Sequence, residues 1–119
     1  MVETFRAVRA ELHHFFSRNT RERLRLIEGV YHVRNSDERR VIVRDGRYSG
    51  YEYILIAIPR GRAIGEVLAA IRPTGRFGDF ELRYTRRGIS QPVPIRLSGR
   101  ELVITRRNEP PVWLNRVVP

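Results

Sequence analysis

The chain has 119 residues and a formal net charge of +10, from 23 basic and 13 acidic residues, and every basic residue is arginine. It contains no cysteine, which excludes disulfides, thiolate nucleophiles and cysteine-ligated metal sites. The absence of lysine excludes Walker-A phosphate loops, Schiff-base enzymes and lysine general bases in their usual form, because arginine stays protonated and cannot act as a base.

Apolar residues make up 41% of the chain, which at this length is enough for the core of one folded domain. The longest aliphatic run, Ile54 to Ile58, is far shorter than the roughly 20 residues of a membrane-spanning helix. The first residues are charged and lack the apolar region of a secretory signal. We therefore expect a soluble, cytoplasmic protein. The arginine-rich composition is typical of a thermophile, and equally of a GC-rich genome.

Two helices are predicted at the start of the chain. Between residues 2 and 17, apolar side chains recur at spacings of three and four and form one stripe, at Phe5, Val8, Leu12 and Phe15. Asn19 is placed to cap a second helix, with Glu22 three positions later as the partner of a capping box. Gly29 is a suitable stop, so the second helix is expected over residues 20–28.

The apolar pattern then changes to a period of two and predicts three strands. The first two, residues 30–34 and 39–44, flank a turn-rich tetrapeptide and are expected to form a hairpin. The third, residues 51–58, is apolar on both faces, which is typical of a strand in the middle of a sheet.

Residues 63–71 are predicted to form a helix, because apolar side chains occupy the i, i+3, i+4 and i+7 positions, at Ile64, Val67, Leu68 and Ile71. Three further strands are expected at residues 80–86, 93–97 and 101–106, which turn-forming residues separate. Residues 108–119 are broken by prolines, and we expect a tail that packs on the domain or on a partner.

The predicted order of elements is ααβββαβββ. Short hairpin connections favour antiparallel pairing, so we expect residues 1–107 to form one α+β domain with helices packed on one face of a mostly antiparallel sheet. The alternative is a small, partly closed β-barrel with appended helices, because glycine-rich turns at regular spacing also suit a barrel.

The strongest functional signal is the placement of arginines on predicted strands. In residues 80–87 the apolar side chains Phe80, Leu82 and Tyr84 alternate with polar ones that include Arg83 and Arg87. If such strands are neighbours, outward arginines form a basic surface that neutralises phosphates, and tyrosines in a nearby turn stack on unpaired bases. The predicted nucleic-acid-binding residues are Arg40, Arg44, Arg47, Tyr48, Tyr51, Arg83, Arg86, Arg87, Arg96, Arg106 and Arg107.

We therefore predict a non-enzymatic protein that binds single-stranded DNA or RNA, or a ribonucleoprotein, without a cofactor. The competing interpretation of each arginine alone is a solubilising residue that pairs with an acidic neighbour such as Glu38, Glu81 or Glu101. The set as a whole favours binding, because a net charge of +10 on a small domain causes self-repulsion that a polyanion relieves.

Two other classes of function are compatible with the sequence. A protein-interaction or assembly subunit would meet an acidic partner, or a second copy in a homodimer, through the apolar anchors Phe16 and Trp113. A metal-dependent nuclease is the third class, because Asp79 and Glu81 resemble an acid-x-acid strand, but Arg83 stands where a lysine is expected. We predict no catalytic residue and no metal ligand.

Overall fold

The computed structural model describes residues 4–6, 27–59, 64–85 and 91–118. Within these ranges the regular structure is entirely β, and none of the described residues is helical. The strands are β1 (Thr4–Arg6), β2 (Gly29–Val33), β3 (Arg39–Arg44), β4 (Tyr53–Ile58), β5 (Ile64–Pro73), β6 (Asp79–Tyr84), β7 (Val93–Ser98), β8 (Glu101–Ile104) and β9 (Val112–Val118).

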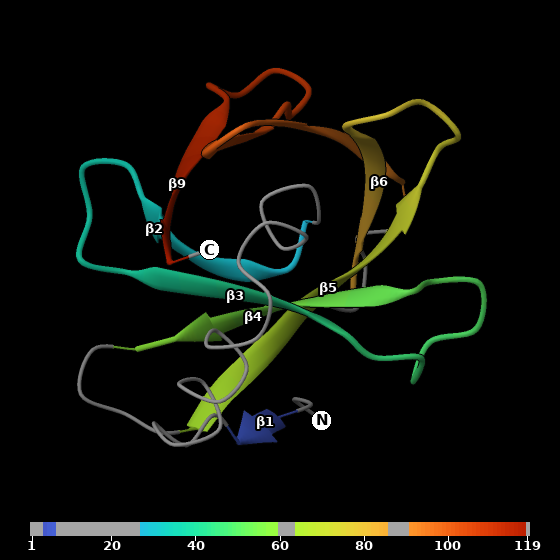
Figure 1. The fold of residues 1–119 in the computed structure, drawn as a ribbon, viewed down its shortest axis with the longest axis horizontal. Coiled ribbons are helices and arrows are strands. Elements are labelled where there is room, and N and C mark those ends of the chain that lie inside the picture. Colours follow the sequence, from blue (N-terminus) through green and yellow to red (C-terminus); the bar gives the residue numbers. More distant parts are fainter. Residues whose placement is uncertain (1–3, 7–26, 60–63, 86–90, 119) are drawn as a thin grey trace.

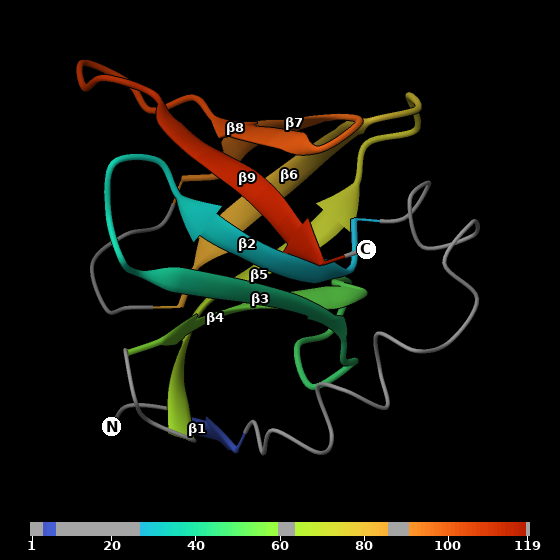
Figure 2. The ribbon, with the colours of Figure 1, turned by 60° about the vertical axis from the view of Figure 1, so that its left-hand side comes forward.

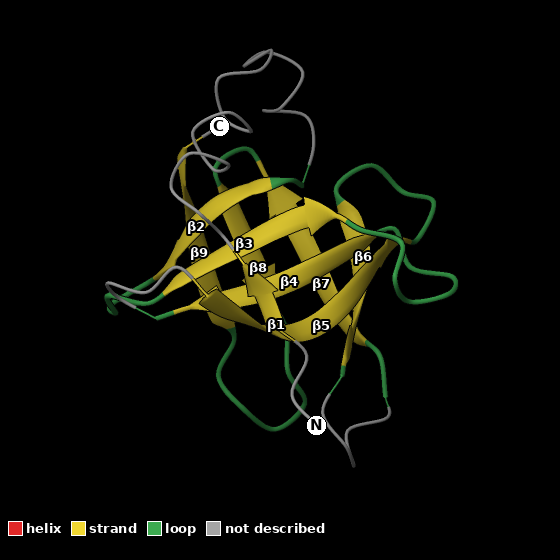
Figure 3. Ribbon diagram, turned by 90° about the horizontal axis from the view of Figure 1, so that it is seen from below, coloured by secondary structure: helices red, strands yellow, loops and turns green. Residues whose placement is uncertain are grey.

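The strands from β2 to β9 close into an antiparallel barrel (Figure 1). Each strand pairs with the next along the chain, and β9 pairs back with β2, so that β9 lies between β2 and β8 (Figure 2). β1 lies outside this ring beside the first half of β5, where Thr4 pairs with Glu66 (Figure 3). Closure gives backbone partners to groups that the edges of an open sheet leave unpaired.

Two layers of apolar side chains are buried on opposite faces of the sheet. The inner layer fills the barrel and contains Ile27, Tyr31, Ile42, Tyr53, Leu55, Ala69, Ile71, Leu82, Ile95, Leu102, Ile104 and Leu114. The outer layer, on the other face of β2 to β5, contains Val30, Val41, Val43, Ile54, Ile56, Ile58 and Val67. β3 and β4 are therefore buried on both faces, which fits their β-branched, nearly continuous apolar sequences.

The six strands predicted from the sequence are confirmed. The segments expected at 30–34, 39–44, 51–58, 80–86, 93–97 and 101–106 correspond to β2, β3, β4, β6, β7 and β8, with bounds that differ by no more than two residues. The β2–β3 hairpin turns at Asn35, whose φ of 64° lies in the left-handed region that asparagine tolerates better than most residues.

The predicted α+β class is wrong, since the described part of the chain is all β and the sheet is a closed barrel. The partly closed barrel with appended helices is nearer to the structure, but the ring is fully closed and the described residues contain no helix. Short hairpins predict antiparallel pairing correctly, but they do not show whether the first and last strands of a sheet meet.

The helix predicted over residues 63–71 is the largest local error, because this segment forms β5. A β-bulge between β4 and β5 pairs Ile56 with Val67 but Leu55 with Ala69, which leaves Leu68 as the extra residue. Val67 therefore packs in the outer layer, whereas Leu68 packs against the inner layer. A strand that is buried on both faces and bulged lacks the alternation of an ordinary strand, so its apolar spacing imitates a helix.

The predictions for the two ends of the chain disagree with the structure wherever it describes those residues. The helix predicted over residues 2–17 is wrong at residues 4–6, which form β1, and its remainder lies outside the described residues. The helix predicted over 20–28 is not observed at residues 27 and 28, and residues 20–26 lie outside the described part. The segment 108–119, expected to be a tail, contributes β9 to the barrel wall.

No helix that could cross a membrane occurs among the described residues.

Replacing Gly65 with alanine is expected to lower the free energy of unfolding by about 1–3 kcal/mol, the usual cost of overpacking a filled site. A Cβ atom at this position would lie 2.5 Å from Ile56 Cγ2 and 2.8 Å from the Ala57 carbonyl oxygen, where β5 passes close to β4. Gly46→Ala is the control, since a Cβ there meets nothing within 4 Å. Urea denaturation of both variants measures the difference, and equal stabilities would refute the close approach.

Candidate nucleic-acid interface

The connections between strands lie at the two ends of the barrel. One end, which we call the Phe77 end, carries the β3–β4, β5–β6 and β7–β8 connections, residues 45–52, 74–78 and 99–100. The opposite end, the Tyr84 end, carries the β2–β3 turn, the β8–β9 loop and the described residues of the β6–β7 connection. In Figure 1 the β3–β4 loop, in green, and the β5–β6 turn, in yellow, both project from the right-hand side of the barrel.

The most exposed large apolar side chain among the described residues is Phe77, with 89% of its surface accessible. It lies in the tight β5–β6 turn, which is closed by hydrogen bonds from the Asp79 amide to the Arg76 carbonyl, at 3.1 Å, and from the Thr74 amide to the Asp79 carbonyl, at 3.2 Å. Gly78 turns the chain at a φ of 82°. The neighbouring Arg76 forms no ion pair with any described residue. This short turn thus presents an aromatic ring and a guanidinium to solvent.

A second aromatic–arginine pair lies at the same end. The Arg72 guanidinium, at the end of β5, lies 5.1 Å from the centre of the Tyr51 ring in the β3–β4 loop. The Arg72 Nε lies 2.6 Å from a carboxylate oxygen of Glu81, and this hydrogen bond raises the pKa of Arg72. The amide of Glu52 donates to the Ile71 carbonyl at 3.1 Å, which fixes the loop to β5. Tyr51 is thereby oriented by contacts with β5.

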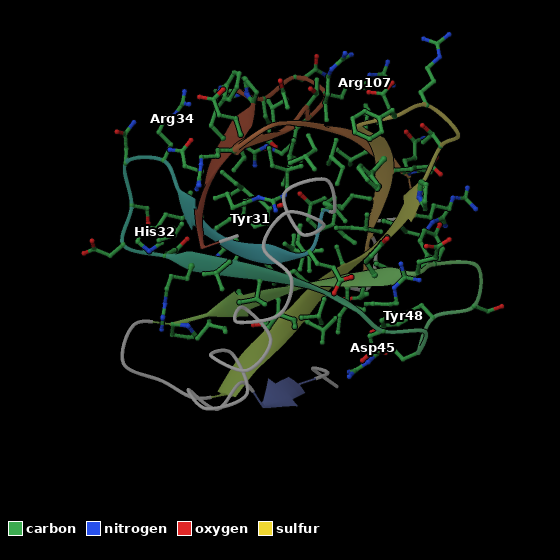
Figure 4. The ribbon with its side chains drawn as sticks, in the orientation of Figure 1. Tyr31, His32, Arg34, Asp45, Tyr48 and Arg107 are labelled. Carbon is green, nitrogen blue, oxygen red and sulfur yellow. The ribbon has the colours of Figure 1, made fainter. Side chains whose placement is uncertain are left out.

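Three predicted binding residues of β3 and the β3–β4 loop are engaged within the protein. Arg44 donates to the Tyr53 hydroxyl at 3.2 Å and lies 3.9 Å from a carboxylate oxygen of Glu28 and of Glu52. Arg47 lies 2.9 Å from Asp45, and its hydrogen bond lowers the pKa of that carboxyl. Tyr48 is half-buried and packs against the outer layer. Figure 4 shows Asp45 and Tyr48 at the opposite end of the barrel from Arg34.

The outward orientation that we assigned to Arg40 and Arg44 is wrong. Both lie on the same face of β3 as Ile42, which faces the barrel interior, and Val41 and Val43 occupy the other face. Their charged groups reach polar neighbours at the two ends of the barrel: Arg40 lies 3.0 Å from Glu38, and its side chain is only 19% exposed. The alternation itself was predicted correctly, but the outer face of β3 carries Val41 and Val43, and Arg44 reaches solvent at the end of the strand, where 62% of its side chain is exposed.

Arg83 and Arg96 do lie on the outer face of the barrel, on the neighbouring strands β6 and β7, and both are exposed. They do not form one patch. Arg96 pairs in register with Asp79, four residues before Arg83, so the two arginines are about 13 Å apart along the strand. Arg96 lies 3.6 Å from the Asp79 carboxylate, whereas Arg83 has no ion pair among the described residues.

The remaining predicted arginines belong to the Tyr84 end. Arg106 lies 3.1 Å from Glu109 and donates to the Pro110 carbonyl at 3.0 Å. Arg107 is exposed and forms no ion pair within the described residues (Figure 4). A pocket of about 540 Å³ lies beside them and is lined by Tyr84, Gln91, Pro92, Val93, Pro94, Thr105, Arg106, Arg107 and Glu109. Arg86 and Arg87 lie outside the described residues.

The structure also locates one of the two predicted partner-binding residues. Trp113 is half-buried on the outer face of β9, with the Arg34 guanidinium 4.6 Å from its ring centre. Arg34 in turn lies 3.2 Å from Glu101. Phe16 lies outside the described residues.

The acidic residues of the nuclease interpretation, Asp79 and Glu81, are each paired with an arginine, Arg96 and Arg72 respectively. No group of three or more potential metal ligands occurs among the residues that the structure describes.

Ion pairing thus separates the arginines into two groups. Seven of the described arginines have a carboxylate neighbour, as the competing interpretation expects. Within the described ranges, the arginines without an ion pair and with at least partly exposed side chains are Arg39, Arg76, Arg83, Arg100 and Arg107. Two of these, Arg76 and Arg100, lie in adjacent turns at the Phe77 end, where the Leu97 amide donates to the Gly78 carbonyl at 2.7 Å.

Phe77 and the pocket are not among the residues and sites predicted from the sequence. Gly75 and Gly78 bracket Phe77 and mark a turn, which is the local signal that its ring is exposed. The pocket is formed by strands and loops that are distant in sequence, so no local signal predicts it.

Comparison with known proteins gives no relative for this barrel: no family model, no curated protein and no solved structure matches the chain. The structure defines a small closed antiparallel β-barrel with exposed arginines at both ends.

Proposed function

We propose that the protein is a non-enzymatic, cytoplasmic binder of single-stranded DNA or RNA and that it binds the strand at the Phe77 end. Phe77 stacks on an unpaired base, and Arg76 and Arg100 contact the neighbouring phosphates. The observation that carries the proposal is the 89% exposure of Phe77 in a turn whose adjacent arginine has no ion pair among the described residues. One copy of the chain supplies all three residues.

The chemistry of the Phe77 end suits a single strand better than a duplex. Aromatic stacking is open to any unpaired base, because every base has a π face, whereas the bases of a duplex are already stacked. Guanidinium groups bind phosphate oxygens through two parallel hydrogen bonds, and exposed arginines are free to do so. The net charge of +10 favours association with a polyanion.

The Tyr51–Arg72 pair extends this surface. Arg72 lies over the Tyr51 ring and is anchored by Glu81, so both side chains hold their positions before any ligand arrives. A surface that is ordered in advance loses less conformational entropy on binding. We assign Tyr51 and Arg72 a supporting role beside Phe77, because the Glu81 carboxylate already neutralises Arg72.

Replacing Phe77 with alanine is expected to weaken binding of a fluorescently labelled single-stranded oligonucleotide by about 5- to 150-fold, the range for the loss of one stacked base. Because the side chain is almost fully exposed, the fold should be unaffected. Phe77→Leu should weaken binding nearly as much, since leucine keeps the apolar contact but loses the ring. Fluorescence anisotropy at low salt measures the affinities.

Val103→Ala is the control, because Val103 is a partly exposed apolar residue on the outer face of β8, between the inner-layer residues Leu102 and Ile104, and lies outside the Phe77 end. It should bind like the parent protein. Arg76→Ala and Arg100→Ala should each reduce the slope of log affinity against log salt by about one. The proposal fails if the parent protein does not bind single strands at low salt, or if Phe77→Ala binds as tightly as the parent. Retained binding by Phe77→Leu would contradict stacking, because it would show that an apolar side chain without a ring is enough for the contact.

A further inference from the structure

The pocket at the Tyr84 end has the size of a small-molecule site. Its volume of about 540 Å³ lies between β6, β7 and the β8–β9 loop, and small-ligand sites typically span roughly 300–1,000 Å³. The amide of Thr105 donates to the Pro94 carbonyl at 3.1 Å, so the strands beneath the pocket are held together by a backbone hydrogen bond. The pocket is therefore a hollow in the barrel wall and its adjoining loop.

The walls of the pocket suit a flat ring. Tyr84 supplies an aromatic side chain that packs partly against the inner layer, and Pro92, Val93 and Pro94 supply apolar surface beside it. Aromatic and proline rings pack well against planar groups, because both present flat apolar faces. Gln91 offers amide donors and acceptors for the polar edge of such a ring.

The charge of the pocket favours an anion. Arg106 and Arg107 line it together with one carboxylate, Glu109, which lies 3.1 Å from Arg106. Arg107 is exposed and has no ion pair among the described residues, so the charged side chains that line the pocket sum to one net positive charge. The Nε of Arg106 is buried and finds no hydrogen-bond partner in the described part of the chain. A buried donor without an acceptor is unfavourable, and an anion bound nearby would stabilise the positive charge of this guanidinium.

From these features we propose that the pocket binds a phosphorylated nucleoside, with the base against Tyr84 and the prolines and the phosphate on Arg107. A free mononucleotide and the 5′-terminal nucleotide of a strand present the same chemistry. This inference does not depend on the proposed site at Phe77, because that site and the pocket lie at opposite ends of β6. The six residues of β6 separate the two sites by about 17 Å.

Isothermal titration of the full chain with AMP, adenosine and inorganic phosphate tests the pocket. AMP should bind, and adenosine and phosphate alone should each bind at least about tenfold more weakly, because each lacks one of the two recognised groups. Amide NMR shifts should change at Gln91, Val93 and Thr105. Comparing a 5′-phosphorylated with a 5′-hydroxyl oligonucleotide separates the two sources of the ligand: a preference for the phosphorylated end identifies the strand terminus, and equal affinity identifies the free nucleotide.

Arg107→Ala should lower the affinity for AMP by about tenfold, the usual effect of losing one charge-assisted hydrogen bond to phosphate. Arg39→Ala is the control, since Arg39 is also a partly exposed arginine without an ion pair among the described residues but lies on β3, which borders none of the strands around the pocket; it should leave AMP binding unchanged. Phe77→Ala should likewise leave AMP binding unchanged, so failure of one site does not decide the other.

The pocket proposal is overturned if AMP does not bind at about 1 mM, a concentration that would detect even a weak site. It is also overturned if adenosine binds as tightly as AMP, if Arg107→Ala has no effect, or if the shifted amides lie in residues 74–78. Tyr84→Leu, which keeps an apolar side chain against the inner layer, should weaken AMP binding without unfolding the barrel, and a parent-like affinity would remove the ring from the site.

Discussion

Replacing Arg116 with alanine is expected to lower the free energy of unfolding by about 2–5 kcal/mol, the usual loss when a large buried side chain is truncated and its hydrogen-bond acceptors are left unsatisfied. Arg116 lies on β9, faces the barrel interior and is only 4% exposed. Its guanidinium donates to the Tyr31 hydroxyl at 2.9 Å and to the Glu28 carbonyl at 3.4 Å, and it lies 5.2 Å from the centre of the Tyr31 ring. Alanine would leave these acceptors without their donor and a cavity beside the ring.

Chemical denaturation of Arg116→Ala beside Arg100→Ala measures this loss. Arg100 is exposed in the β7–β8 turn, so its replacement should change stability by no more than about 0.5 kcal/mol. If the two alanine variants lose the same free energy of unfolding, the Arg116 side chain does not stabilise the barrel interior. Arg116→Met should lose less than the alanine variant, because the longer side chain refills most of the cavity.

Arg116 also shows why the last strand could not be predicted from local patterns. Val112, Leu114 and Arg116 share the inner face of β9, so an arginine occupies a position where an alternating strand would carry an apolar residue. Pro110 and Pro111, which precede this strand, also favour the prediction of an irregular tail. β9 is specified by pairing that is distant in sequence, with Val33 opposite Leu114. Barrel closure is a property of such long-range pairs, which a reading of neighbouring residues does not reveal.

The candidate site was predicted in part. Arg44, Arg47, Tyr48 and Tyr51 do belong to one end of the barrel, as their closeness in sequence suggests, but the first three are engaged by partners or packing inside the protein. The sequence does not distinguish an arginine that is neutralised by a carboxylate from one that is available. That distinction depends on which acidic residue the fold brings alongside, as Glu81 is brought to Arg72 across two strands.

Raising the pH from about 10 to about 12 is expected to reduce the free energy of unfolding by about 2 kcal/mol through Tyr31 alone. Burial raises the pKa of Tyr31 from 10.0 to about 12, although the neighbouring Arg116 partly offsets this effect. Below pH 10 the hydroxyl is neutral in both states, and the full stability is present. Between the two values the unfolded chain loses the proton and the folded chain keeps it, so stability falls as the pH rises.

The absence of lysine makes this transition unusually simple to interpret, because arginine stays charged and tyrosine is the side chain that titrates in this range. Burial also raises the pKa of Tyr53, with Arg44 opposing it, so Tyr53 acts in the same direction. Urea denaturation across the range should give a declining stability, and Tyr31→Phe should flatten that decline, whatever its own stability at neutral pH. An equally steep decline in Tyr31→Phe would show that the Tyr31 hydroxyl is not the group whose titration destabilises the fold.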